Sequence, residues 1–131
     1  MATINKEIEI NRSREFVWDA IRDVGNIHKR LVVGFVTDCK LEGDWRTVTF
    51  ANGMTVREFI VSIDDQTFRH SWSVRSDMLK HHNASAQVFS EGPDKCRVVW
   101  IADVMPNAAA AVMDGMIQQG LSAMKQTLEA Q

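Results

Sequence analysis

The chain ends in a long amphipathic stretch, residues 107–129, with the sequence NAAAAVMDGMIQQGLSAMKQTLE. Polar residues separate its large apolar residues, which recur every three or four positions and are Val112, Met113, Met116, Ile117, Leu121, Met124 and Leu128. This spacing predicts a single helix with one buried face. Pro106 stops the preceding segment, and Asn107 is a candidate N-cap. At about 1.5 Å per residue the helix would be roughly 33 Å long, which is enough to cross a small domain.

Nearly everything before this helix has the pattern of short strands, because apolar and polar residues alternate. The predicted strands cover residues 4–10, 32–41, 46–50, 54–60, 68–75, 81–90 and 96–105. The last strand has apolar residues on both faces, so its inward face stays open. Ser13 is the expected N-cap of a short helix that ends at Gly25, and residues 26–31 allow one further helical turn. The sequence therefore predicts one α+β domain, residues 1–131, in which a curved antiparallel sheet of seven strands wraps around the C-terminal helix and two short helices follow the first strand.

The Asn-Gly pair at residues 52–53 marks the clearest hairpin of this sheet. A two-residue turn would pair apolar with charged side chains, whereas a three-residue loop sets Val48 opposite Val56. In that register Arg46 lies opposite Glu58. We favour it because a shift of one residue moves every side chain to the other face, and this register sorts the faces better.

The chosen register places Arg46 and Glu58 on the inward face. A buried ion pair is a weak source of stability, since removing both charges from water can cost more than their attraction returns. Two interpretations remain open. The pair forms the polar end of an internal cavity, or both side chains reach the sheet edge and stay hydrated.

The composition is that of an ordinary globular protein, with 131 residues, 45% of them hydrophobic and 24% charged. A net charge of −2 with intermixed signs argues against a nucleic-acid partner, which would require a basic patch. No apolar run is long enough to span a membrane, and the first residues lack the apolar core of a signal peptide. Cys39 and Cys96 have no motif spacing, so reduced thiols in a cytoplasmic protein are expected.

Several stretches resemble a known superfamily. Residues 13–26, which begin SREFVW and end DVGN, are similar to the opening helix of the START-like, Bet v 1-type (SRPBCC) proteins. Residues 43–53 (GDWRTVTFANG), followed by Glu58 and by residues 63–65 (IDD), are similar to the polyketide cyclase/dehydrase and lipid-transport branch. Residues 120–125 (GLSAMK) fit the final helix of that family, so the resemblance extends over essentially the whole chain.

The resemblance implies a helix-grip fold with a deep cavity between sheet and C-terminal helix, which takes a small apolar or amphipathic molecule without a cofactor. The residues that match cavity-facing positions of the family are Arg46, Val48, Phe50, Glu58, Trp72, Val74, Leu79, His82, Ala84, Val112, Met116 and Gln119, or Gly120 in place of Gln119. His82 stands where relatives often have tyrosine. The short loop at residues 51–53 is unlike the longer gating loop of the related plant hormone receptors, which argues against a ligand-gated partner switch.

The four histidines do not form a metal-binding motif. His81 and His82 are adjacent on a strand and point to opposite faces, so they cannot bind one ion together. No nucleophile motif accompanies either cysteine. Proton transfer is the remaining chemistry, because His82 or His70 together with Glu58 would suffice for a cyclase or dehydratase with a shaped pocket.

Three functions therefore stay open. The first is a carrier or sensor of a small hydrophobic molecule, such as a lipid, a polyketide or an aromatic compound. The second is a cofactor-independent cyclase or dehydratase that uses His82 or His70 together with Glu58, and the third is a protein-interaction module with a collapsed cavity. Trp45 and Phe59 form an outward aromatic pair in the chosen register, which indicates a candidate homodimer surface.

Overall fold

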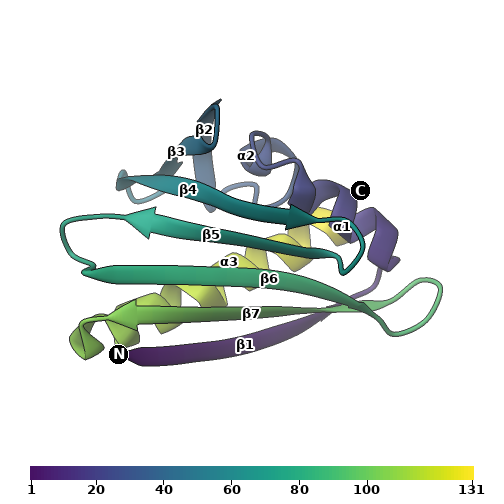
Figure 1. Cartoon of the computed structure of the whole chain (residues 1–131). Coiled ribbons are helices and arrows are strands. Elements are labelled where there is room, and N and C mark those ends of the chain that lie inside the picture. The colour runs from purple at the N-terminus through teal and green to yellow at the C-terminus, as the bar shows by residue number, and fades with distance from the viewer.

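Seven antiparallel strands form one sheet in the computed structural model, which describes residues 1–131 (Figure 1). The strand order is β1-β7-β6-β5-β4-β3-β2, so the chain runs as a meander from β2 to β7 and β1 (Ala2–Ile10) lies beside the last strand. The meander consists of β2 (Val36–Glu42), β3 (Trp45–Phe50), β4 (Thr55–Asp64), β5 (Arg69–Arg75), β6 (His81–Ser90) and β7 (Cys96–Met105). This architecture confirms the predicted α+β helix-grip fold.

Two short helices follow β1 and lie at one end of the sheet (Figure 1). The first, α1 (Arg14–Arg22), is capped as predicted, since Ser13 Oγ accepts a hydrogen bond from the Phe16 N–H at 3.1 Å. The second, α2 (Ile27–Arg30), is a single turn whose only buried residue is Ile27. Both helices close the end of the space that the sheet and the C-terminal helix enclose.

The C-terminal helix α3 (Ala110–Glu129) crosses one face of the sheet (Figure 1). It begins later than predicted, because Asn107–Ala109 form a separate 3₁₀ turn. Asn107 is not the predicted N-cap: it lies inside that turn, and neither the turn nor α3 has a side-chain cap. The first turn of α3 therefore lacks the stabilisation that Ser13 gives to α1. None of the helices is long and apolar enough to cross a membrane.

The predicted hairpin register is confirmed. Arg46 pairs with Glu58 and Val48 pairs with Val56 across β3 and β4. The Phe50 N–H donates to the Met54 carbonyl at 2.8 Å, which closes the three-residue loop. Gly53 has a φ of 88°, a left-handed conformation that glycine adopts without steric cost.

The second strand is shorter than predicted and begins at Val36 instead of residue 32. Gly34 has a φ of 86°, which is incompatible with an extended strand, and the preceding residues form turns. Val33 lies outside the sheet strand as a result and is 55% exposed. Only the part of the segment after the glycine joins the sheet.

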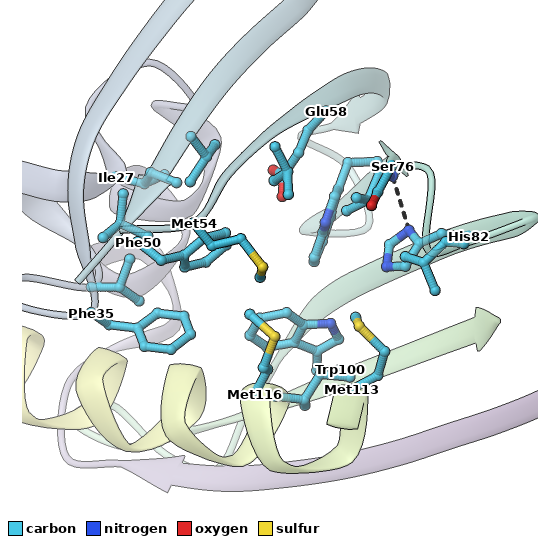
Figure 2. Close-up of a pocket in the computed structure, with 18 of the residues that line it drawn as sticks. Ile27, Phe35, Phe50, Met54, Glu58, Ser76, His82, Trp100, Met113 and Met116 are labelled. Carbon is cyan, nitrogen blue, oxygen red and sulfur yellow. Dashed lines mark hydrogen bonds between the residues drawn. The ribbon is translucent and has the colours of Figure 1, made fainter. Parts of the chain in front are cut away.

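The inward face of the last strand is settled by the structure. Val98, Ala102 and Val104 are fully buried on β7, whereas Ile101 is exposed on the opposite face. Trp100 shares the parity of the buried set and therefore points toward α3 (Figure 2).

One half of the interior is close-packed and includes the C-terminal half of α3. Its side chains have at most a trace of exposed surface and come from β1, α1, β6, β7 and α3. We call this set the packed half, and it consists of Ile10, Val17, Val88, Cys96, Val98, Leu121 and Leu128.

Candidate ligand-binding cavity

The other half of the interior is hollow. A cavity of about 380 Å³ lies between the sheet and α3, and 23 of its 29 lining residues are hydrophobic. Figure 2 shows side chains from the sheet, from the loop after β3 and from α3 projecting toward this space. Its volume and its apolar wall are typical of a small-molecule site. None of the packed-half residues lines it.

Ten of the twelve predicted ligand-binding residues lie on the cavity wall. They are Arg46, Val48, Phe50, Glu58, Trp72, Val74, Leu79, His82, Val112 and Met116. His70, the remaining candidate for proton transfer, lies on the same wall. The structure thus brings side chains from four strands, one loop and one helix to a single space.

Two of the predicted positions do not line the cavity. Gln119 is exposed on α3, because the buried face of that helix passes through Ile117 and Leu121, and Gln119 lies between them on the opposite side. Its alternative, Gly120, is buried but packs against the Trp100 ring instead of the open space. Ala84 points inward and is buried, yet its methyl group stays beside the larger Trp72 of the neighbouring strand.

Several lining residues were not predicted to face the cavity. Three are methionines that surround the space from different elements: Met54, Met78 and Met113. Met113 belongs to the apolar stripe of the helix, so the spacing already contained its signal. Trp100 was missed because the inward face of β7 was open. Met54 begins the predicted strand 54–60 and has the parity of inward Val56, so the alternation already contained its signal.

Lining residues that are exposed to solvent mark the mouth of the cavity. Met78, in the loop between β5 and β6, is 72% exposed, and Val112, in the first turn of α3, is 60% exposed. These two segments meet the open end of the space. The uncapped start of α3 is therefore part of the entrance.

Arg46 and Glu58 form a buried ion pair in the cavity wall. Their side chains are only 6% and 7% exposed, and Arg46 Nε donates to Glu58 Oε1 at 2.7 Å. A second guanidinium nitrogen donates to the Val24 carbonyl at 3.1 Å. The alternative in which both side chains are hydrated at the sheet edge is therefore wrong. The other carboxylate oxygen, Glu58 Oε2, has no partner in the protein, so the pair presents a free acceptor to the cavity.

His82 is a buried, neutral ring with a fixed proton position. The Val74 N–H donates to His82 Nδ1 at 3.0 Å, and a backbone amide can only donate, so Nδ1 carries the lone pair and Nε2 carries the proton. Burial lowers the pKa of His82 to about 4. Figure 2 shows the second ring nitrogen turned into the cavity, on the side of Met113 and Trp100.

His70 has the opposite arrangement. Its Nδ1 lies 3.0 Å from the Ser62 carbonyl oxygen, which can only accept, so Nδ1 carries the proton. Its Nε2 then holds a lone pair and has no partner, although the residue is only 3% exposed. Burial and the nearby charge of Arg46 lower the pKa of His70 to about 4. The ring stacks on Trp72 with a centroid distance of 4.9 Å.

The two histidines are too far apart to share a proton. His70 pairs with Ala86, four residues along β6 from His82, which is a separation of roughly 13 Å. Glu58 pairs with Val74, so the strand β5 lies between Glu58 and His82. The cysteines add no nucleophile, because burial raises the pKa of both thiols, to about 11 for Cys96.

The sequence of the chain identifies its family. A family model described as polyketide cyclase / dehydrase and lipid transport matches residues 1–129. The chain belongs to this family. The match includes residues 43–53, and the predicted resemblance to this family is confirmed. No curated protein sequence matches the chain.

Solved structures show how widely this fold is used. The protein XoxI from Bacillus cereus is 22% identical, with a TM-score of 0.87 over 98% of this chain and 96% of that one. A START superfamily protein from Mycobacterium smegmatis is 10% identical, with a TM-score of 0.75 and coverage of 98% and 94%. Norcoclaurine synthase from Thalictrum flavum, solved as a point mutant with a transition-state analogue, is 18% identical, with a TM-score of 0.72 and coverage of 98% and 92%. At sequence identities of 10–22%, the similarity to these structures shows a shared fold alone.

Proposed function

We propose that the protein binds a small hydrophobic or amphipathic molecule, such as a lipid, a polyketide or an aromatic compound, in the cavity between the sheet and α3. The cavity carries this proposal, because about 380 Å³ of space with 23 hydrophobic residues among 29 is not filled by the protein itself. Protein interiors are normally close-packed, and side chains beside a void lose dispersion contacts. A bound apolar molecule would supply those contacts, and Arg46 with Glu58 would form the polar end of its site.

The histidines favour binding over proton transfer. A general base works best with a pKa near the working pH, whereas burial holds the pKa of both His70 and His82 at about 4. His82 also has no lone pair free for a proton, since Nδ1 already accepts from Val74. Both rings are better suited to hydrogen-bonding a ligand than to moving its protons.

A cyclase or dehydratase remains the second candidate, and Glu58 is the residue that favours it. Its Oε1 atom accepts from Arg46, no hydrogen bond from the protein reaches Oε2, and Glu58 lines the cavity, so a carboxylate oxygen is available for proton transfer to a bound molecule. Norcoclaurine synthase shows that an enzyme can have this fold. Glu58→Gln would abolish turnover in an enzyme of this kind and leave ligand affinity within a few-fold, whereas in a binder it would change affinity alone.

The third candidate, an interaction module with a collapsed cavity, loses its premise because the cavity is open. A homodimer stays part of the proposal. Trp45 and Phe59 lie opposite each other on the outer face with ring centroids 5.1 Å apart, and Arg57 lies over Trp45 at 4.4 Å. Light scattering tests this surface: a dimer that Phe59→Ser converts to a monomer supports it, and a monomer at high concentration contradicts it.

Native mass spectrometry of the purified protein is the first test of binding. We expect an added mass that disappears under denaturing conditions, and we expect Met116→Trp to remove it because the larger ring fills the cavity. Gln119→Trp is the matched control, since it adds the same ring to the exposed side of α3 only three residues away. An added mass that survives Met116→Trp would place the ligand outside the cavity, and an empty protein that also fails to bind neutral aromatic probes would overturn the proposal.

A further inference from the structure

The backbone fixes the hydrogen-bonding role of both cavity histidines, and His82 is the one that is left with a donor. The Val74 N–H occupies Nδ1, so the ring offers an N–H donor at Nε2 and no acceptor. The protein supplies no partner for that donor, and Nε2 is not fully enclosed, so it stays accessible although the residue as a whole is only 3% exposed. A ligand that fills the cavity removes water from this donor, and a buried donor without a partner costs free energy, so the ligand must supply an acceptor.

The charges around the cavity limit what this acceptor is. The only lining residues with a formal charge at neutral pH are Arg46 and Glu58, and they neutralise each other through a hydrogen bond of 2.7 Å. The Arg46 guanidinium also donates to the Val24 carbonyl. The charge of Arg75 acts on His82, but this side chain is exposed and does not line the cavity. A carboxylate or phosphate placed beside His82 would therefore have no unpaired cation in the cavity wall, which is made mostly of apolar side chains.

The surroundings of His82 indicate the rest of the ligand. Figure 2 places Met113 and Trp100 beside the inward ring nitrogen, with Met116 next along α3. Aromatic rings and methionines provide a flat, polarisable and adaptable wall. These surroundings favour a largely apolar molecule that extends from His82 toward Phe35 and Phe50 on the far side of the cavity.

We infer that the ligand carries an uncharged oxygen acceptor, a ketone, ester or quinone carbonyl, that takes the Nε2–H of His82. This inference rests on the proposed binding function and names the ligand class within it. His82 sets specificity in this assignment: it distinguishes a carbonyl compound from a hydrocarbon of the same shape and from a carboxylic acid. A fatty acid anion is a poor ligand for the same site.

Three naphthalene probes test the assignment. They are 2-acetylnaphthalene, which has the carbonyl, 2-isopropenylnaphthalene, which has the same shape without it, and 2-naphthoate, which has a carboxylate. Their dissociation constants are measured by tryptophan fluorescence with the wild-type protein, His82→Phe and His82→Gln. Glutamine is the rescuing variant, because its amide oxygen can accept from Val74 while its NH₂ group donates to the ligand.

We expect the preference for the ketone over the hydrocarbon to fall about tenfold in His82→Phe, since the carbonyl is then buried without a partner. His82→Gln should retain the preference to within about threefold, and 2-naphthoate should bind the wild type at least about tenfold more weakly than the ketone. A preference that is unchanged in His82→Phe, or tightest binding of the carboxylate, overturns the inference while leaving the binding function intact. Failure of all three probes together with an empty native mass overturns both.

A second readout does not depend on any ligand. Long-range ¹⁵N–¹H correlation spectra of the imidazole rings report which nitrogen carries the proton. We expect His82 to be the Nε2–H form and to stay neutral from pH 8 to pH 5. An Nδ1–H form contradicts the donor role, and a charged ring in this range contradicts the neutral ring on which the preference for an uncharged acceptor rests, even if the variant proteins fold poorly.

Discussion

The two halves of the interior share one helix and one sheet, but they differ in the side chains that fill them. The packed half uses branched and compact residues such as Leu121, Val98 and Ile10, which interlock without voids. The hollow half uses methionines, aromatic rings and four ionisable residues around open space. The difference indicates that packing in the packed half provides most of the stability. The side chains of the hollow half are then free to contact a ligand instead of one another.

The buried ion pair is the exception within the hollow half, and it gives the largest expected effect. Arg46→Met removes the partner of Glu58 and leaves a carboxylate buried without compensation, which we expect to lower the free energy of unfolding by about 3–5 kcal/mol. Urea denaturation at pH 7 measures it. Arg46→Met combined with Glu58→Leu should recover most of the loss, because no charge stays buried. A loss below about 1 kcal/mol for the single variant would mean that the pair is hydrated.

Two truncations on α3 compare the halves directly. Leu121→Ala should cost about 2–5 kcal/mol, because it opens a cavity in a close-packed region. Met116→Ala should cost about 1 kcal/mol or less, since Met116 is half-buried and already borders open space. Urea denaturation of both variants gives the comparison. Equal costs would show that the hollow half is as tightly packed as the other.

Most of the fold was predictable because it depends on periodicity. The spacing of the helix from Val112 to Leu128 and the alternation of the strands fix which faces are buried, and the loop at residues 52–53 fixed the register that joined Arg46 to Glu58. The errors arose where backbone geometry departs from a period. Gly34 breaks the start of β2, and the turn at Asn107–Ala109 delays α3.

The cavity wall was predictable in identity but not in chemistry. The matching positions placed His82 on the wall, and His70 was a candidate for proton transfer there, yet neither prediction showed which ring nitrogen carries a proton. That depends on the Val74 amide and the Ser62 carbonyl, which approach through strand pairing and the bulge in β4. Such contacts leave no pattern in one sequence, because any residue has a backbone amide and carbonyl.

The two neutral histidines make the hollow half sensitive to acid. The folded protein holds the pKa of each ring at about 4, against about 6.5 for a free histidine, so the unfolded chain binds more protons below pH 6.5. Their full contribution to stability is present above pH 6.5 and is lost as the pH falls toward 4. We expect a loss of about 2 kcal/mol for each ring between pH 7 and pH 5, measured by urea denaturation.

His82→Gln provides the control for this prediction, because glutamine keeps the hydrogen bond from Val74 and does not titrate. The variant should lose about half as much stability as the wild type over the same pH range. A wild-type stability that stays constant from pH 7 to pH 5 would mean that the folded protein accepts protons on these rings without cost.

Alanine substitutions at two glycines of α3 test how rigidly the Trp100 ring, which lies between the packed and the hollow half, is held in place. A Cβ at Gly115 would meet nothing within 4 Å, so Gly115→Ala should stabilise the protein by about 0.5–1 kcal/mol through helix propensity alone. A Cβ at Gly120 would lie 3.0 Å from Trp100 Cζ3, so the same substitution must displace that ring and should instead cost about 1 kcal/mol. Thermal unfolding gives the stabilities, and the Trp100 indole resonance reports the displacement. If Gly120→Ala stabilises the protein as much as Gly115→Ala does, the Trp100 ring is displaced without a loss of folding free energy. The ring that separates packed from hollow interior would then be a movable wall, and the cavity could adjust its volume to its ligand.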